Sequence, residues 1–428
     1  MSSGFNILCT KLEQTLALRQ EKGRLIDPPS PAKLQEMADF SSNDSLSLSS
    51  SGALTRAFLN QLKKHPNFTI GSTSSRILDG TKQYLLDLER DIAKFHGAEA
   101  AVFFNSGYDA NVAVWSTIPQ SGDIVVYDEY VHASIHDGMR RGRADTIAFK
   151  HNDSHALGLC LEKIQKENAG IAKGTRVVFI ALESFYSMDG DAVAATQLLE
   201  VAHKTLPRKN FIFSIDEAHS NGLIGPKGSG FICHHGLENQ FPIRLQTCGK
   251  GMGSSGATLL CNETIKFTLL NYARGVIFST APTFLTAAAV RAGYDLIASD
   301  EGENRRRRLQ ENISRFYRKL TSHAKWSEVK SKGVLYLPTE ETWHLGPFQS
   351  PIVAVIPQSK LAADLGNYLA ESGYWVNTVH FPIVPNDMDR IRIVLHTDNT
   401  AEQIDRVVEL IMEWAVMQIR PRQAAAKL

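Results

Sequence analysis

The stretch Phe211–Gly225 reads FIFSIDEAHSNGLIG, and it indicates the fold more clearly than any other part of the chain. Its beginning, Phe211–Ile215, is apolar apart from one serine, which is typical of a strand buried on both faces. Asp216 and His219 follow this strand directly. Mostly parallel sheets bind ligands at the carboxyl ends of their strands, so both side chains are candidates for a ligand site. Taken alone, Asp-x-x-His fits equally a carboxylate that caps a turn beside a packed histidine.

Further short runs of β-branched or aromatic residues predict more strands, and segments with helical spacing separate them. In Gln83–His96, for example, Leu85, Leu88, Ile92 and Phe95 fall three or four residues apart and form one apolar stripe. Strands that alternate with helices predict an α/β fold with a mostly parallel central sheet covered on both faces. The predicted strands are Ala101–Phe104, Asp123–Tyr127, Arg176–Leu182, Phe211–Ile215, Thr258–Cys261, Pro351–Ile356 and Ile391–Leu395.

The pattern divides the chain into an N-terminal segment, two α/β regions and a tail. We expect these at residues 1–50, 51–290 (large domain), 291–418 (smaller C-terminal domain, with a helix at Ala401–Val416) and 419–428. The serine-rich run Ser41–Ser51 predicts a solvated loop. The run Arg305–Arg308 predicts a solvated helix face, with a phosphate or RNA site as the alternative.

The composition excludes several classes of protein. The 428 residues carry 46 Lys and Arg against 45 Asp and Glu, and the formal net charge of +1 argues against a nucleic-acid partner or a polybasic membrane protein. The uncharged stretch Gly275–Val290 is shorter than the ~20 apolar residues of a membrane-spanning helix. The N-terminus lacks the pattern of a secretory signal. The 5 cysteines have no CxxC spacing, which predicts reduced intracellular thiols and no metal site.

A second informative stretch, Thr247–Gly256, reads TCGKGMGSSG and carries one lysine, Lys250. Its small residues allow the backbone to approach a bound group closely. A lysine shielded from water has a lowered pKa and reacts with aldehydes, although a lysine between glycines is more often a loop charge. The spacing is not that of a phosphate-binding P-loop. Asp216 could hold a protonated pyridine nitrogen, which is the chemistry of pyridoxal phosphate.

Three other predicted strand ends carry polar residues. Asn105–Asn111 forms a turn into a helix, where free N–H groups suit a phosphate. His132 offers a flat imidazole that could lie on an aromatic ring, although His132 alone is more often a satisfied core histidine. Glu183–Asp191 follows another strand. Their joint placement at strand ends favours a shared site.

These residues resemble the α-oxoamine synthase family of pyridoxal phosphate enzymes, over roughly Asp39 to Glu413. The matching elements are HND (His151–Asp153), SMDGD (Ser187–Asp191), IDEAHSNGLIG (Ile215–Gly225), TCGKGMGSSGA (Thr247–Ala257), FSTA (Phe278–Ala281), SDEGENRR (Ser299–Arg306) and FPIVPNDMDRIRI (Phe381–Ile393). The resemblance implies a fold type I pyridoxal-phosphate-dependent transferase of aminotransferase-like architecture. It also implies a homodimer with active sites at the subunit interface.

The resemblance implies roles for particular residues. The catalytic residues would be Lys250, which links to the cofactor and acts as base, with Asp216, His219 and His132. The cofactor would be held by Gly107, Tyr108, His132, Ser187, Asp216, His219, Thr247, Lys250 and, from the partner subunit, Thr280. Asp216 would pair with the pyridine nitrogen and His132 would stack on the ring. The substrate would be bound by Asn43, Ser75 and Arg392, whose guanidinium fits a carboxylate.

The family reaction condenses an amino acid with an acyl-CoA and releases CoA and carbon dioxide. Ser75 and Ile77 replace a threonine and an asparagine of the 5-aminolevulinate type, and the smaller Ser75 favours alanine or serine over glycine. The end of the chain, Ala426-Lys427-Leu428, resembles the peroxisomal address Ser-Lys-Leu, with a frayed helical tail and a cytoplasmic site as the alternative. Peroxisomal β-oxidation supplies dicarboxylic acyl-CoA. We therefore expect L-alanine and pimeloyl-CoA as substrates and 8-amino-7-oxononanoate, a biotin precursor, as product.

Three elements depart from the usual family pattern and leave the acyl group open. They are Thr73-Ser74, Asn43–Leu48 and Pro282-Thr283-Phe284. The alternatives are serine or glycine as the amino acid, and a fatty or polyketide acyl thioester, on CoA or on a carrier protein. The HND, SMDGD and FPIVP elements disfavour an ordinary aminotransferase. A non-catalytic regulatory subunit is disfavoured because Lys250 is present.

Overall fold

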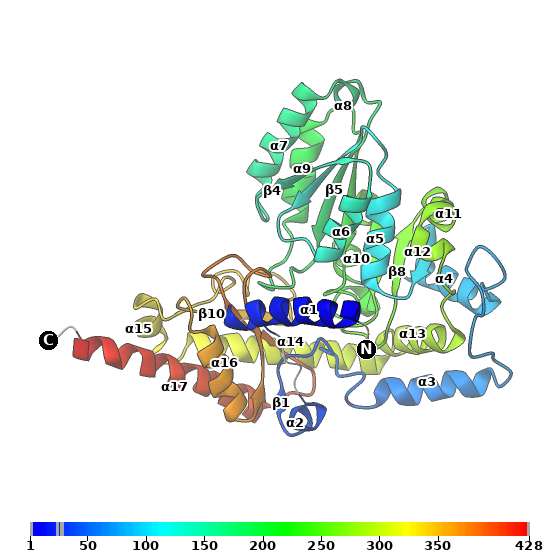
Figure 1. The fold of residues 1–428 in the computed structure, drawn as a ribbon. Coiled ribbons are helices and arrows are strands. Elements are labelled where there is room, and N and C mark those ends of the chain that lie inside the picture. The colour runs from blue at the N-terminus through cyan, green and yellow to red at the C-terminus, as the bar shows by residue number, and fades with distance from the viewer. Residues whose placement is uncertain (1–2, 23–24, 26–29, 426–428) are drawn as a thin grey trace.

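A seven-stranded sheet forms the centre of the molecule (Figure 1). The structure, a computed structural model, describes residues 3–22, 25 and 30–425. The strand order is β2-β8-β7-β6-β5-β3-β4, and only β8 runs antiparallel to its neighbours. The strands are β2 (Ala100–Phe104), β3 (Ile124–Asp128), β4 (Asp145–Phe149), β5 (Val178–Glu183), β6 (Phe211–Asp216), β7 (Ile243–Thr247) and β8 (Ala257–Cys261). The predicted α/β fold with a mostly parallel sheet is confirmed.

Helices cover both faces of this sheet, because its central strands are apolar on both faces. In β3, Ile124 and Val126 join one hydrophobic cluster and Val125 joins the other. The first cluster includes side chains of α4 (Gln83–Phe95), α7 (Ser154–Glu167), α9 (Ala195–Thr205) and α10 (Phe231–His235). The second includes side chains of α5 (Gly107–Thr117), α6 (Ala133–Arg141), α11 (Glu263–Tyr272) and α12 (Arg274–Ile277). The predicted apolar stripe of Gln83–His96 is the buried face of α4.

The C-terminal region is built on a second, four-stranded sheet with the order β12-β13-β10-β9. Its strands are β9 (Leu335–Tyr336), β10 (Ile352–Pro357), β12 (Asn377–Val379) and β13 (Arg390–Val394). Its helices are α14 (Asp300–Thr321), α15 (Trp326–Ser331), α16 (Ala362–Glu371) and α17 (Ala401–Ala425). Further helices are α2 (Pro31–Gln35), α3 (Ala53–Lys64), α8 (Ala169–Lys173) and α13 (Phe284–Ile297). The boundary that we expected between the large and the smaller domain, at residue 290, lies within α13.

The N-terminal segment forms hydrogen bonds with the C-terminal region. Strand β1 (Ala38–Asp39) pairs in parallel with β11 (Tyr374–Trp375). The N–H group of Val394 donates to the carbonyl of Phe40 at 2.8 Å, and that of Thr397 donates to the carbonyl of Ser45 at the same distance. The serine-rich run is therefore not a solvated loop at its centre, because Ser45–Leu48 is buried between the two regions. That prediction was wrong for these residues.

The arginine run on α14 is also only partly solvated. Arg307 and Arg308 are exposed as predicted, but Arg306 is buried and donates to the carbonyl of Ile297 at 2.8 Å. Arg305 donates to the carbonyl of Leu46 at 3.0 Å. The prediction of a solvated face was wrong for these two residues, because unpaired carbonyl groups of a loop and of a helix end lie against them.

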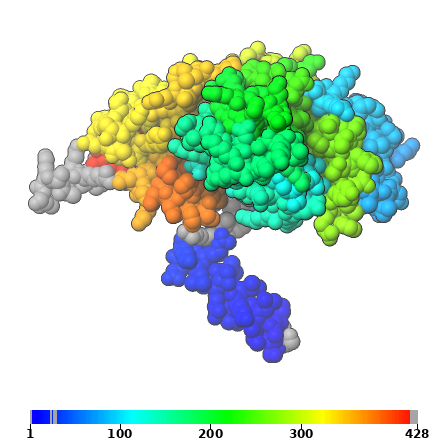
Figure 2. Space-filling view, turned by 90° about the horizontal axis from the view of Figure 1, so that it is seen from above, coloured from blue at the N-terminus to red at the C-terminus, as the bar shows by residue number. Residues whose placement is uncertain are grey.

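Helix α1 (Ser3–Glu21) projects away from the body of the molecule (Figure 2). None of its residues is buried. Its large apolar side chains are about half exposed, namely Phe5, Ile7, Leu8, Leu12, Leu16 and Leu18. None of the described helices is long and apolar enough to cross a membrane.

Candidate active site

Three carboxylates end adjacent strands of the central sheet. Asp128 ends β3, Glu183 ends β5 and Asp216 ends β6, and the register places Glu183 directly beside Asp216. All three are buried. Burial raises the pKa of Glu183 well above its ordinary value, and the neighbouring charge of Asp216 adds to this effect. Such a cluster needs nearby positive or hydrogen-donating groups, which the following loops supply.

Lys250 lies in the loop between β7 and β8 and faces His219, which follows β6. The Lys250 Nζ atom is 2.8 Å from the Nε2 atom of His219. Burial lowers the pKa of Lys250, although the charges of Asp216 and Glu183 oppose this shift. Burial also lowers the pKa of His219 well below its ordinary value, and the nearby cations Lys250 and Arg392 lower it further. The lowered pKa makes the uncharged amine of Lys250, the form that reacts with an aldehyde, more accessible than that of a free lysine.

A chain of hydrogen bonds connects Asp216 with His132. Asn111 Nδ2 donates to Asp216 Oδ2 at 2.8 Å and to Ser134 Oγ at 2.9 Å. The Ser134 Oγ atom is in turn 2.8 Å from His132 Nδ1. The backbone N–H of His132 donates to Glu183. This network fixes the imidazole of His132 and the carboxylate of Asp216 relative to each other.

The start of α5 forms a close cradle with the end of β7. A Cβ atom at Gly107 would lie 2.5 Å from Thr247 Oγ1, so only glycine permits this approach. Ser106 caps the helix by accepting from the N–H of Asp109 at 3.0 Å. The first N–H groups of a helix have no partner within it and bind phosphate well. Tyr108 contributes only its N–H here, because its hydroxyl group donates to Asp137. These residues fit a phosphate group, and buried Asp216 fits a protonated ring nitrogen.

Arg392 and Asn43 meet at the junction of the two regions. Arg392, on β13, donates from Nη2 to Asn43 Oδ1 at 3.0 Å and from Nε to the carbonyl of Ser187 at 2.6 Å. Burial lowers the pKa of Arg392 to about 10, so the guanidinium stays charged near neutral pH. Within the described part of the chain, no carboxylate forms an ion pair with it. A buried cation without an anionic partner fits the carboxylate of a substrate.

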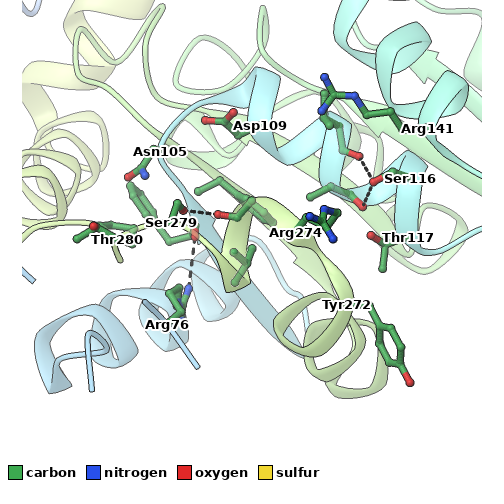
Figure 3. Close-up of a pocket in the computed structure, with 17 residues that line it drawn as sticks. Arg76, Asn105, Asp109, Ser116, Thr117, Arg141, Tyr272, Arg274, Ser279 and Thr280 are labelled. Carbon is green, nitrogen blue, oxygen red and sulfur yellow. Dashed lines mark hydrogen bonds between the residues drawn. The ribbon is translucent and has the colours of Figure 1, made fainter. Parts of the chain in front are cut away.

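Ser75 and Thr280 lie elsewhere. They pair with each other across an isolated antiparallel bridge. Thr280 lines a cavity of about 380 Å³ together with Asn105 and Arg274, shown in Figure 3. Neither Lys250 nor Asp216 lines this cavity, so it is a second cavity, distinct from the site around Lys250. Of the predicted site residues, therefore, all but Ser75 and Thr280 belong to the elements that surround Lys250.

A charged histidine holds the loop that carries Ser187. His151 bonds through Nδ1 to Asp128 at 2.9 Å and through Nε2 to Asp191 at 3.0 Å. Burial opposes the charge, but hydrogen bonds to these two carboxylates raise the pKa of His151 to about 10. Ligand atoms of His151, Asp189 and Asp191 lie within 4.8 Å of one another, yet each already has a protein partner.

Sequence reasoning did not assign roles to Asn111, Ser134, Glu183 or His151. Their partners come from distant parts of the chain, so local patterns do not reveal them. One signal was available: Asn111 follows Gly107 by four residues, which places it on the same face of α5 as the phosphate cradle.

Known proteins are similar to this chain over nearly its whole length. A sequence profile of the aminotransferase class I and II family matches residues 35–411. The aminoacyl transferase sphA of Aspergillus fumigatus is 37% identical over 406 residues, which are 94% of this chain and 86% of the relative. The 8-amino-7-oxononanoate synthase of Emericella nidulans is 38% identical over 401 residues, 93% of this chain and 94% of the relative.

Two solved structures extend the comparison. The serine palmitoyltransferase of Sphingomonas wittichii superimposes with a TM-score of 0.76 at 25% identity, covering 96% of this chain and 97% of that one. The 8-amino-7-oxononanoate synthase of Francisella tularensis gives 0.67 at 28% identity, covering 90% and 99%. The chain therefore belongs to the aminotransferase class I and II family and, within it, to the α-oxoamine synthases, enzymes whose cofactor is pyridoxal phosphate.

Proposed function

We propose that the protein joins an amino acid to the acyl group of an acyl-CoA and releases carbon dioxide and free CoA. The observation that carries this proposal is Arg392, a buried cation without a carboxylate partner, next to the buried Lys250–His219 pair. The arginine would bind the carboxylate of the amino acid, and the lysine would reach its α-carbon. The site residues as a group support the same chemistry.

The cofactor, when bound, supplies an electron-poor ring that withdraws electrons from the α-carbon of the substrate. The residues of the chain supply the rest. The negative charge of Asp216 would keep a ring nitrogen protonated, and Asn111 and the N–H of Ala218 orient that carboxylate. Lys250 would take the α-proton in its uncharged form, and His219, 2.8 Å from Nζ, holds the amine in place. His132 would lie against one face of the ring.

L-Alanine is the first candidate for the amino acid. The support is Ser75, a smaller residue than the threonine of the 5-aminolevulinate type. Ser75 pairs with Thr280 across an isolated bridge, so it would act on the same site as Thr280. Serine and glycine are the alternatives, and comparison of kcat/KM for the three amino acids decides between them.

Two kinds of acyl group are candidates. Pimeloyl-CoA, with product 8-amino-7-oxononanoate, is supported by the relatives of that name. An uncharged fatty or polyketide acyl thioester is supported by the likeness to a serine palmitoyltransferase.

The reaction is tested with the purified protein, carboxyl-labelled L-alanine and an acyl-CoA. We expect thiol release and labelled carbon dioxide in equal amounts, and Lys250→Ala should give neither. Formation of pyruvate without thiol release would identify an ordinary aminotransferase instead. Absence of bound pyridoxal phosphate would leave only a non-catalytic role.

A homodimer with shared active sites is part of the proposal. Support comes from Thr280, Tyr272 and Phe278, which lie exposed around the second cavity. Mixing inactive Lys250→Ala subunits with impaired Thr280→Ala subunits should restore part of the activity, because one site per mixed dimer would combine two intact contributions. Activity no higher than the sum of the separate variants would contradict the shared site.

A peroxisomal location rests on Ala426-Lys427-Leu428, which lie outside the described residues. A fluorescent protein fused to the N-terminus should form puncta that disperse when Leu428 is deleted. A diffuse signal in both cases would remove this support for a dicarboxylic acyl-CoA.

A further inference from the structure

A cleft of about 650 Å³ extends from the active site, with His132 and Ser187 in its lining. One wall is the start of α6 with Val131 and Ala133, and the other is the loop with Ile383 and Val384. Met188 also lines it. The cleft adjoins the expected position of the reacting groups, and its lining combines aliphatic side chains and two prolines with charged and imidazole groups.

Both arginines that line this cleft are paired with a carboxylate. Arg390 forms an ion pair with Asp189, and its side chain is only 2% exposed. Arg140 forms an ion pair with Asp137 at 2.5 Å, and Asp137 also accepts from Tyr108. Glu129 accepts from the backbone N–H of His151 at 3.0 Å. The lining thus offers two carboxylates and two arginines, and each arginine already has a carboxylate partner.

The imidazole groups do not supply a further positive charge. Burial lowers the pKa of His136, and the adjacent charge of Arg140 lowers it further. Burial likewise lowers the pKa of His132. An acyl chain that ends in a carboxylate would therefore lose water in this cleft without gaining a free cation, and it would approach Glu129. Placing an anion in such surroundings is unfavourable.

Arg392 provides the contrast within the same site. It is a buried arginine that no described carboxylate neutralises, and it suits an anionic group. The cleft has no equivalent of it. We propose that this cleft receives the acyl chain of the second substrate, and that its lining selects an uncharged aliphatic chain over one that ends in a carboxylate. This inference rests on the proposed function and chooses between its two acyl candidates.

The test compares heptanoyl-CoA with pimeloyl-CoA, which have the same chain length and differ in the terminal carboxylate. With L-alanine as co-substrate and thiol release as the readout, we expect a kcat/KM at least about tenfold higher for heptanoyl-CoA, corresponding to ~1.4 kcal/mol. Equal values, or a preference for pimeloyl-CoA, would overturn the inference and leave the proposed function intact. No thiol release from either compound would overturn both.

Ile383 allows a gain-of-function test, because its side chain is 63% exposed and a longer one fits there. Ile383→Arg should shift the preference towards pimeloyl-CoA, whereas Ile383→Gln, of similar length but uncharged, should not. An equal shift in both variants would contradict the electrostatic explanation.

Arg140→Gln tests whether Arg140 binds the terminal carboxylate of the acyl chain instead. A selective fall in the rate with pimeloyl-CoA would show that it does, and would contradict the proposed preference.

Discussion

The site around Lys250 and the cavity around Thr280 differ in how far one chain completes them. Around Lys250, the polar groups have partners within the chain, and the Asp216–Asn111–Ser134–His132 network fixes their geometry. Around Thr280, large apolar side chains point to solvent, and Tyr272 and Phe278 are each 71% exposed. This difference indicates that the reactive groups around Lys250 are positioned within one chain. The apolar surface around Thr280, in contrast, would be covered only by another molecule.

The strongest test of this contrast is Lys250→Ala. Removing the amine should lower kcat by about 10⁴-fold, at the upper end for a lost general base. Borohydride reduction followed by peptide mass spectrometry should find the cofactor on Lys250 in the natural protein and nowhere in the variant. An adduct on a different lysine would break the contrast, since the organised cavity would then not be the reactive one. Lys227→Ala, outside the site, serves as the control.

The Asp216→Asn variant tests the network by removing charge while keeping shape. We expect kcat to fall about 10²–10³-fold, as when other preorganised electrostatic contacts are removed. Folding should persist because Asn111 can still pair with an amide. Absorbance of the bound cofactor should change in Asp216→Asn and stay the same in Asp91→Asn, a surface control. Unchanged kcat would mean that Asp216 does not face the cofactor.

Arg392→Gln tests the proposed binding site for the carboxylate of the amino acid. Hydrogen bonds to charged groups contribute about 1.5–3 kcal/mol, so KM for the amino acid should rise roughly 10–100-fold, with a smaller change for the acyl-CoA. Arg307→Gln, an exposed residue of α14, is the control. Equal increases for both substrates would indicate general damage to the site.

The smallest expected effect is a decrease in the free energy of unfolding when His151 is replaced. Its pKa in the folded protein is about 10 against an ordinary value of 6.5. The protonated form is therefore stabilised by folding, and this contribution is complete below pH 6.5 and is lost as the pH rises towards 10. His151→Gln should lower the free energy of unfolding by about 1.5–3 kcal/mol at pH 6 and by much less at pH 10.

Denaturant unfolding at several pH values measures this dependence. His155→Gln, on the exposed face of α7, should show no such trend. A constant difference between His151→Gln and the natural protein across the pH range would show that His151 stabilises the loop by packing alone.

The sequence predicted seven of the strands and missed others, among them β7 and β4. Strands β2, β5 and β6 were found within about two residues. Strand β7 was missed because Arg244 and Gln246 interrupt its apolar run. Both are buried, and Gln246 donates to Glu217, a partner that only the folded sheet provides. Strand β4 was missed because most of it is exposed.

The site was predicted by its motifs and not by its supporting contacts. The positions of Lys250, Asp216 and His219 follow from the rule about strand ends. The burial of Arg306 could not be predicted from sequence motifs, because it depends on a hydrogen bond to the carbonyl of Ile297 at a helix end. Likewise, the prediction that Thr280 acts on another subunit concerns a partner chain and stays a prediction.

The pairing of the N-terminal segment with the end of the chain has a consequence for biosynthesis. Asn43 contacts Arg392, and β1 pairs with β11, so the proposed amino-acid pocket combines residues that are far apart in the chain. A ribosome makes the first of these long before the last. The pocket therefore cannot close during translation, and the nascent enzyme stays inactive until nearly the whole polypeptide has left the exit tunnel.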